Sequence, residues 1–528
     1  MNKKKLKARF KAAEKIYDAT YNELELAALY TYPHTLLESD HERVDQAFLC
    51  DTTLREGLRS LVSNVTNLQT PQDRRWGGIG INESEFPDGV PDENREFTEA
   101  QSERMFEFIR DSNFKNAEWE TVIDEFSIGT GAIVPSINDE DKLHFEAIPL
   151  KQLRIIENKR TGVIDTVFRV NALPARDIVA QAKWSPSDKV RRKADKSPEE
   201  EIIIVESFVP KDGRTREWEY IVSEKDNAWH QLFSEDFDWR KIVAHRNDKR
   251  SGQTWGWSIA RDNLPHAMTL NALTEYILDH DEATAKPLLW SRDAHTQQEE
   301  LQNGQWISGS EVPQTVILAG DISTSFADLQ RLQQRLLRAL HADAFPPLER
   351  PSNMTATEFL GRQRQFITQV APFSDRMDRE LYKPLLHSVF RLLQKTGKLA
   401  SVDPQGRPFV MDGKPYRIIT NSLVAQAQQI EEVQKHFVAL EQFALFGPAL
   451  FQGFRVDRFI PWALKEMGIQ SAFINEEQLA SSLQNGSPEQ LQGIVQNFLG
   501  IANQTASQSP GALNNLAANI SNLGGGTA

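Results

Sequence analysis

The stretch RPSNMTATEFLGRQRQF, residues 350–366, joins a stiff loop to the start of a long helix. Thr355 can cap the helix, and Glu358, three residues later, can reach back to the backbone of the cap, which is a capping box. Three prolines between residues 346 and 351 restrict the conformations of the loop before this cap. We therefore expect an exposed, stiff loop directly ahead of one of the longest helices of the protein.

Two further helices and an insert precede this loop. The apolar periodicity of SIARDNLPHAMTLNALTEYILDHDEATA predicts a helix over 258–285, and that of SFADLQRLQQRLLRALHADAF predicts a second helix over 325–345. Residues 286–324 between them are expected to form short strands and turns. The long helix then runs over 355–397, bent at its internal prolines, Pro372 and Pro384.

The rest of the chain mixes helices and strands, which predicts an α+β fold. Helices are expected over 8–66 and 98–124, with the glycines at 77–80 in a turn. Short β-rich runs follow from about 125 to 245. They are interrupted by KWSPSDKVRRKADKSPEEE, which we interpret as an exposed loop or short helix. After the long helix, PFVMD (408–412) and YRIIT (416–420) are expected to pair, followed by helices and a tail without aromatic or charged residues.

The amino-acid composition excludes several classes of function. The chain has 528 residues, 40% hydrophobic and 25% charged, and its formal net charge is −14. Such an acidic protein is poorly suited to wrap DNA tightly, because phosphate contacts need Lys and Arg, although it can still enclose DNA. The single cysteine, Cys50, excludes an intramolecular disulfide framework and a multi-cysteine metal site. The basic start, MNKKKLKARFKAAEK, lacks the apolar segment of a secretory signal, and no apolar run suits a membrane span, so we expect no membrane association.

The sequence contains no motif that assembles catalytic chemistry. It has no GxxxxGK[ST], HExxH or GxSxG pattern. The glycines at 77–80 and 129–131 are too few for a dinucleotide-binding fingerprint. The acidic residues of 279–282 point in different directions on a helix, so they cannot converge on a metal alone. We expect no catalytic residues, no metal ligands and no cofactor, and hence no enzyme.

A basic stripe is the most informative cluster. Arg331, Arg335 and Arg338 recur at i, i+4 and i+7, so they lie on one face of the helix over 325–345. A neighbouring stripe that can pack holds Leu329, Leu332, Leu336 and Leu340. The arginines could pair with an adjacent acidic helix, or they could form a basic ring that faces a polyanion. Residues 258–345 hold twelve Asp or Glu and six Lys or Arg, so the arginines have many possible protein partners.

The order helix, insert, helix, stiff loop and long helix resembles the centre of phage portal proteins. The likeness is greatest to the head-to-tail connectors of short-tailed phages, the podoviruses. Segments at 21–33, 128–134, 245–275 and 378–397 are similar to further parts of that family: YNELELAALYTYP, IGTGAIV, HRNDKRSGQTWGWSIARDNLPHAMTLNALTE and DRELYKPLLHSVFRLLQKTG. The chain departs from the family at Trp255-Gly256-Trp257-Ser258, where relatives carry Tyr-Gly-Arg-Ser, so no role for that arginine is transferred.

The resemblance implies a portal-protein fold with a β-rich wing, a two-helix stem, a small α/β clip, a channel loop, a long bent helix and a helical crown. The implied divisions are N-terminal helices and wing 1–257, first stem helix 258–285, clip 286–324, second stem helix 325–345, channel loop 346–354, long bent helix 355–397, C-terminal wing or crown 398–475, and crown helices with a flexible tail 476–528.

The resemblance also implies sites and partners. Leu348, Glu349 and Arg350 would lie at the tip of the channel loop. Trp290 and Trp306 would lie at the clip interface, unless they pack within the clip itself. Family members form dodecamers around double-stranded DNA and bind the terminase large subunit, a tail adaptor protein, the major capsid protein and scaffolding or core proteins. The expected location is the portal vertex of the virion, after assembly in the host cytoplasm.

Two other classes of protein are alternatives. A packaging motor enzyme would carry a phosphate loop and a cluster of metal-binding carboxylates, and the sequence shows neither pattern. Another structural protein of the tail or capsid would also lack catalytic motifs. It would not, however, explain the order of helix, insert, helix, loop and helix around residues 350–366.

Overall fold

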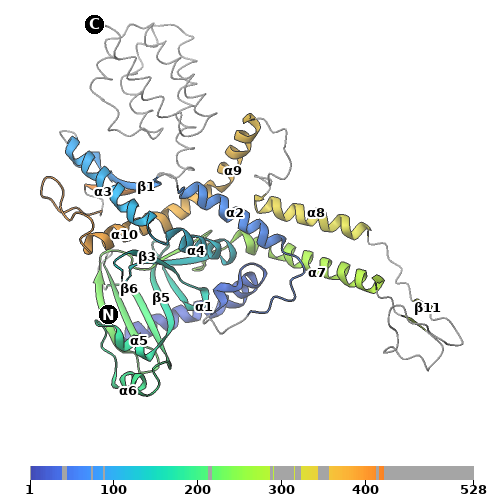
Figure 1. Ribbon diagram of the computed structural model, residues 1–528, viewed down its shortest axis with the longest axis horizontal. Coiled ribbons are helices and arrows are strands. Elements are labelled where there is room, and N and C mark those ends of the chain that lie inside the picture. Colours follow the sequence, from blue (N-terminus) through green and yellow to red (C-terminus); the bar gives the residue numbers. More distant parts are fainter. Residues whose placement is uncertain are drawn as a thin grey trace, which may run out of the picture.

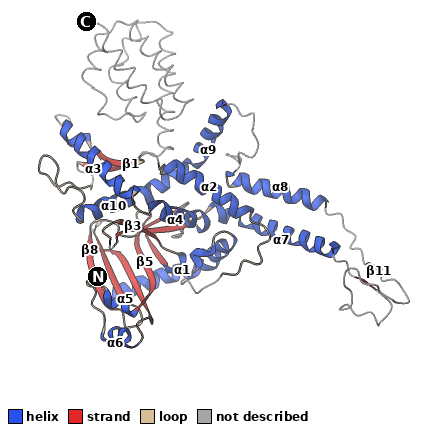
Figure 2. Ribbon diagram, viewed as in Figure 1, coloured by secondary structure: helices blue, strands red, loops and turns tan. Residues whose placement is uncertain are grey.

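The computed structural model combines helices and antiparallel sheets in a mixed α+β fold, which confirms the predicted class (Figure 1, Figure 2). The residues it describes are 2–37, 44–72, 75–86, 90–138, 140–211, 217–285, 289–290, 314–315, 323–342, 356–411 and 415–420.

Helices dominate the first part of the chain. They are α1 (Lys3–Tyr30), the 3-10 turn η1 (Pro33–Leu36), α2 (Thr53–Gln69), the 3-10 turn η2 (Glu83–Glu85), α3 (Asp92–Arg110) and α4 (Phe114–Ile128). The single helix predicted over 98–124 is therefore wrong, because the chain breaks between α3 and α4. Asn113 causes the break: its side chain donates to the carbonyl oxygen of Phe145 and accepts from the amide of Phe145, both at 2.8 Å. A side chain that binds a neighbouring strand in this way competes with continuation of the helix.

A five-stranded antiparallel sheet forms the largest β element. Its strands are β4 (Leu153–Asn158), β5 (Val163–Pro174), β6 (Glu201–Pro210), β7 (Trp218–Glu224) and β8 (His230–Phe237), in the order β4-β5-β6-β7-β8. The first half of α1 packs on one face through Phe10, whose ring meets Phe168 edge to face with centroids 5.4 Å apart. The charged interruption folds as the short helix α6 (Asp188–Lys196), preceded by α5 (Ala175–Ala180). Ser187 caps α6, and Val190 is buried.

A three-stranded sheet connects this region to the helices. It has the order β3-β2-β9, with β2 (Thr130–Ile137), β3 (Leu143–Ala147) and β9 (Val243–Arg246) all antiparallel. The 3-10 turn η3 (Leu150–Gln152) leads from β3 to β4. Helix α4 packs against β2 and β3, and the amide of Asn247, directly after β9, donates to the carbonyl oxygen of Gly129 at the end of α4 (3.1 Å). This arrangement brings the residues around 129 and 246 together.

Strand β1 (Gly77–Ile81) pairs with β12 (Tyr416–Thr420), which corrects two predictions. The glycines at 77–80 form a strand and not a turn, and residues 416–420 pair with this strand, whereas Pro408 of the predicted partner segment bridges Val402. The missing side chains explain the pairing, because a β-carbon at Gly77 would lie 2.9 Å from the carbonyl oxygen of Ile419. At Gly78 it would lie 3.1 Å from the hydroxyl oxygen of Ser102 on α3. Only glycine lets the strand fit between β12 and α3.

The long helix is continuous through both of its prolines. It consists of α9 (Ala356–Met377), the π-helical turn η6 (Asp378–Tyr382) and α10 (Lys383–Lys395). Pro372 stays inside α9, whereas the π turn lies directly ahead of Pro384. A proline has no N–H and its ring crowds the carbonyl four residues earlier, here that of Glu380. The wider turn accommodates both effects, so the departure from α-helical geometry falls one turn before Pro384.

Two helices leave the rest of the structure as an arm (Figure 1). They are α7 (Ile259–Ala285) and α8 (Ser323–Ala339), which lie side by side and match the helices predicted over 258–285 and 325–345. Between them, β10 (Leu289–Trp290) pairs antiparallel with β11 (Gln314–Thr315), so Trp290 is opposite Gln314. The predicted sites at Trp306, Leu348, Glu349 and Arg350 lie outside the described residues, as do Thr355 and everything after residue 420.

Candidate functional site: the base of the helical arm

The start of α7 is fixed by a serine. The Ser258 hydroxyl accepts a hydrogen bond from the amide of Arg261 (3.0 Å), which caps the helix. The same hydroxyl donates to the carbonyl oxygen of Ser127 at the end of α4 (2.7 Å). Because one side chain serves both helices, the arm begins at a defined position on α4.

Two glycines bring the backbones together beside this cap. Gly129 ends α4 in the left-handed conformation, with φ of 98°. A β-carbon at Gly256 would lie 1.9 Å from the carbonyl oxygen of Gly129, a distance that no side chain tolerates. The amide of Gly256 donates to the hydroxyl of Thr130 (2.9 Å), so the contact is also hydrogen-bonded.

The two tryptophans of this segment have different roles. Trp255 is buried and its ring lies 5.9 Å from that of Tyr17 on α1. Trp257 contacts two guanidinium groups, Arg250 at 3.5 Å and Arg261 at 3.8 Å from its ring centroid. Asp262 completes the cluster by accepting from the Trp257 indole (2.7 Å) and from Arg250 (2.6 Å).

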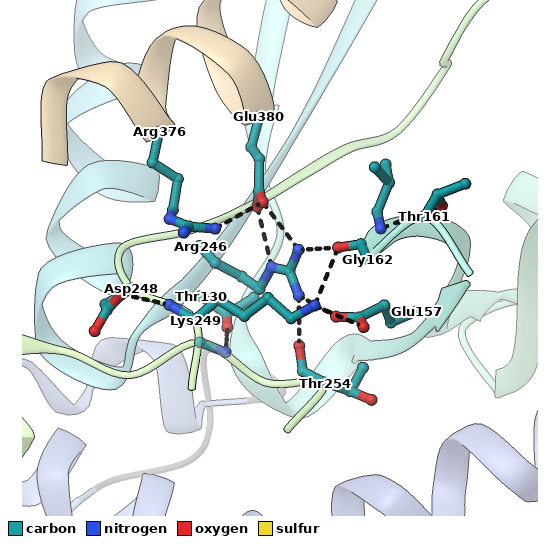
Figure 3. A network of polar contacts seen from close by, with 12 residues as sticks. Thr130, Glu157, Thr161, Gly162, Arg246, Asp248, Lys249, Thr254, Arg376 and Glu380 are labelled. Atoms are coloured by element: carbon teal, nitrogen blue, oxygen red, sulfur yellow. Dashed lines mark hydrogen bonds and ion pairs between the residues drawn. The ribbon is translucent and has the colours of Figure 1, made fainter. Parts of the chain in front are cut away.

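A second arginine cluster forms around Arg246, which also donates to the carbonyl oxygen of Thr254 just ahead of the arm (Figure 3). The Arg246 guanidinium is 0% exposed and makes a bidentate contact with Glu380 of the π turn (2.9 and 3.0 Å). It also donates to Glu157 (2.6 Å) and to the carbonyl oxygen of Gly162 (2.9 Å). Lys249 shares Glu157 at 2.8 Å. Arg246 thus connects the five-stranded sheet, the small sheet and the long helix.

Both partners in this cluster are held in their charged forms. Burial acts to lower the pKa of Arg246, but hydrogen bonds and charges from Glu380 and Glu157 outweigh it and leave the pKa raised. Burial acts to raise the pKa of Glu157, but hydrogen bonds from Lys249 and Arg246 outweigh it and leave the pKa lowered. The cluster is therefore an ion pair network and not a set of groups poised to exchange protons.

The π turn has a further anchor. The Tyr382 hydroxyl donates to the Glu118 carboxylate (2.9 Å), which also accepts from Thr70 (2.6 Å) and from Lys115 (2.9 Å). Burial raises the pKa of Glu118, and burial together with the charge of Glu118 raises the pKa of Tyr382. The long helix is thereby fixed to α2 and α4 as well as to the sheets.

One constellation resembles a catalytic triad in its residue types. His245 contacts Glu125 through Nδ1 (2.6 Å) and Thr121 through Nε2 (2.9 Å). The His245 and Glu125 side chains are completely buried, and Gly131 packs against the imidazole. A substrate has no access to this hydroxyl, so the three residues fix β9 against α4 and are not a reaction centre.

Comparison with known proteins assigns the chain to a family. A family model described as bacteriophage head to tail connecting protein matches residues 3–474. The chain belongs to this family. It is also 27% identical, over 159 residues, to a probable portal protein of Bordetella phage BPP-1. That match covers 29% of this chain and 28% of the relative, so it spans less than a third of either protein.

Membership in the head-to-tail connecting family confirms the resemblance noted from the sequence. The family is described as one of bacteriophage proteins that connect the head to the tail. Among the described helices, none is long and apolar enough to cross a bilayer. No group of three or more His, Cys, Asp or Glu side chains in the described ranges is arranged to hold a metal ion.

The arginine stripe of this connector lies on the outside of the arm. Arg331, Arg335 and Arg338 are all exposed on α8, and Arg331 pairs with Asp328 one turn earlier in its own helix (3.3 Å). The neighbouring leucine stripe packs as predicted, with Leu336 and Leu340 buried and the other two partly buried. Whether the arginines meet DNA or another subunit remains a prediction.

Sequence reasoning missed the arginine cluster of this connector. Arg246 lies within the quoted segment at 245–275, yet nothing in its spacing announces that it is buried. The sequence shows only that a charged residue ends the short segment VAHR. The structure shows that this segment is a strand whose four residues are all buried. Glu157 and Glu380 are 89 and 134 residues away in the chain, so only the tertiary fold shows them as its partners.

Proposed function

We propose that this connector forms the portal ring of a phage head, most simply a dodecamer at one capsid vertex. Double-stranded DNA would enter through its central channel during packaging and leave through it during ejection. Family membership supports a portal role, and the printed name of the Bordetella phage relative agrees with it. The net charge of −14 suits a channel wall that repels phosphate.

The exposed arm is the observation that carries this proposal. Tyr276 and Leu278 on α7 are 69% and 53% exposed, and Met268 on α7 and Phe326 on α8 are also exposed. Large apolar side chains on a narrow projection usually mark a protein interface. Identical neighbours in a ring would cover them, because each arm would be flanked by two others.

The parts of the chain take roles within the ring under this proposal. Helices α7 and α8 would form the stem, residues 286–324 the clip, and residues 346–354 the channel loop. The two large β regions would form the wing, and residues 398–475 and 476–528 would form the C-terminal wing or crown and its tail.

Partners follow from these roles. The clip would bind the terminase large subunit during packaging and a tail adaptor protein afterwards, with Trp290 and Trp306 as apolar anchors. The wing would contact the major capsid protein and scaffolding or core proteins. The ring would assemble in the host cytoplasm and remain at the portal vertex of the virion.

Imaging of the purified protein tests the proposal directly. Negative-stain micrographs should show rings with a central hole, and light scattering should give a mass many times that of one chain. A folded monomer as the only species, across protein concentration and salt, would reject it. Fibres or flat sheets would instead indicate another structural protein of the virion.

The clip and channel loop have separate tests. Deletion of residues 292–312 should leave a ring that cannot support packaging, and normal packaging would reject the clip assignment. Shortening the loop around Leu348, Glu349 and Arg350 should preserve the ring but lower the amount of DNA retained after packaging stops. Unchanged retention would place the gate elsewhere, with the α8 arginine stripe as the next candidate.

A further inference from the structure

The first turns of α1 carry a concentration of positive charge that the portal proposal does not use. Residues 1–15 hold seven Lys or Arg and one Glu, whereas the rest of the chain holds 53 Lys or Arg and 73 Asp or Glu. An acidic protein that concentrates its cations on one short segment has a local field opposite in sign to its overall charge.

Four of these lysines form one face of the helix. Lys4, Lys7, Lys11 and Lys15, which we call the lysine stripe, lie within about 80° of one another on a helix of 3.6 residues per turn. At 1.5 Å per residue the stripe is roughly 16 Å long. Lys4, Lys11 and Lys15 are exposed, and Lys7 is partly exposed.

The opposite side of the same turns holds the helix rigidly to the sheet. Leu6, Phe10 and Ala13 are buried, and the Phe10 ring contacts Trp229 edge to face at 5.1 Å. Arg9 pairs with Asp165 on β5 at 3.2 Å. The stripe is thus presented by a docked helix and not by a free segment.

Some charged side chains of these turns anchor the helix, and others have no partner. Arg9 pairs with Asp165 and Glu14 pairs with Lys225 at 3.7 Å, so both side chains bind the sheet region. In the part of the chain that the structure describes, none of the four ammonium groups of the lysine stripe has an ion-pair or hydrogen-bond partner. Four aligned and unpaired cations are available for an external anion.

We propose that the lysine stripe binds the phosphate backbone of double-stranded DNA without reading its sequence. Double-stranded DNA carries one negative charge per about 1.7 Å of helix axis, so a row of lysines about 16 Å long can contact several phosphates at once. Lysine is a flexible point charge that contacts phosphate without requiring a fixed geometry. The choice of DNA as the polyanion rests on the proposed function, in which the protein works beside a packaged genome.

A protein partner fits this face less well. Lysine is depleted in protein–protein interfaces, which gain most from apolar and aromatic side chains. No large apolar residue between Lys4 and Lys15 is exposed, since Leu6 and Phe10 face the sheet. The arm, with its exposed tyrosine and leucine, has the opposite character. Subunit contact and DNA contact are therefore assigned to different surfaces.

Helix α6 supplies a matched control. It also exposes four cations, Lys189, Arg191, Arg192 and Lys196, on a helix that packs on α5 and whose cap, Ser187, donates to Glu224 of the five-stranded sheet. It differs because Asp188 and Asp195 lie on the same nine-residue helix. Removal of four charges from α6 changes the net charge as much as removal of four from α1.

The test measures binding of the full-length protein to a fluorescent duplex of about 30 base pairs, by anisotropy across a salt series. Replacing all four stripe lysines with Gln should weaken binding at low salt by tenfold or more. It should also lower the slope of log affinity against log salt by about 3.6, the value for four phosphate contacts. The Lys→Arg version should retain binding, and the α6 control should change affinity by less than a factor of about two.

Three other outcomes would overturn the inference. An unchanged affinity in the Gln variant would reject the site, and an equal loss in the α6 control would show an effect of net charge alone. Light scattering on the same samples detects a third case, in which the Gln variant loses its oligomer but keeps its DNA affinity. That result would make the stripe a subunit contact. A wild-type protein that binds DNA through the stripe but forms no ring would reject the portal proposal and leave this inference intact.

Discussion

Gly256 and Gly129 meet backbone to backbone at the base of the arm, where a β-carbon on Gly256 would lie 1.9 Å from the carbonyl oxygen of Gly129. One glycine ends α4 and the other lies two residues before the cap of α7. The direction in which the arm leaves the structure therefore depends on a contact between main chains, which side-chain rearrangement cannot relieve.

Replacement of Gly256 by Ala should be strongly destabilising. The new methyl group meets backbone atoms that cannot rotate away, and overpacking of this kind costs about 1–3 kcal/mol or more. Gly57→Ala is the control, because its methyl group would meet the end of the Leu340 side chain, which can move, and alanine favours the α2 helix. Thermal melting should show a clear loss for Gly256→Ala and little change for Gly57→Ala. Equal losses would mean that the glycine contact is not special.

Arg246→Met should lower the free energy of unfolding by about 3–5 kcal/mol, because it leaves the Glu380 and Glu157 carboxylates without their shared cation. Arg376→Met is the matched control: Arg376 also pairs with Glu380, at 3.3 Å, but its side chain is 31% exposed. An exposed pair of this kind contributes about 0–1 kcal/mol. Denaturant unfolding of the two variants should separate them clearly, and similar midpoints would contradict the role given to burial.

The stability contributed by Glu157 should depend on pH in a defined direction. Its pKa is lowered in the folded protein, so its contribution is present above the unfolded pKa of about 4.3 and is lost as pH falls through the lower folded value. At neutral pH, Glu157→Gln should be less stable than the wild type by roughly 1–3 kcal/mol. The difference should shrink below about pH 4.

Melting temperatures of both proteins at neutral pH and at a series of acidic pH values check this prediction. Glu140→Gln serves as the control, since Glu140 pairs with Lys142 on the surface at 2.8 Å and its loss should leave melting unchanged. A gap between wild type and Glu157→Gln that stays constant into acid would show that the carboxylate charge is not what Arg246 and Lys249 require.

The sequence predicted those elements whose signals are local. Apolar periodicity located α7 and α8 to within a few residues at most ends, and the leucines of α8 were correctly assigned to a packed stripe. The charged interruption was interpreted as an exposed loop or a short helix, and the structure shows the short helix α6 within it. In each case the residues that decide the structure are neighbours in the chain.

The sequence did not predict features that depend on distant partners. Residues 77–81 have no alternation of apolar side chains, so nothing local marks GGIGI as a strand, and its partner β12 lies more than 300 residues later. The break at Asn113 depends on Phe145, and the burial of Arg246 depends on Glu157 and Glu380. The contacts of the Trp257 ring with Arg250 and Arg261 are likewise visible only in the fold.

Tyr276 and Leu278 provide the sharpest test of how the arms assemble. Residues two apart on a helix do not share a face, so these side chains point to different sides of α7, while Ile277 between them is buried. A ring built from head-to-tail contacts places one neighbour on each side of every arm.

We therefore predict that Tyr276→Ser and Leu278→Ser each weaken the proposed ring, because either change damages one half of a repeated contact. Val163→Ser and Val179→Ser, at exposed positions on β5 and α5, should leave it intact. Light scattering over a dilution series should show dissociation at higher concentration for the two arm variants only. Rings as stable as the wild type in both arm variants would mean that the subunits meet elsewhere, and that these two side chains face a different partner.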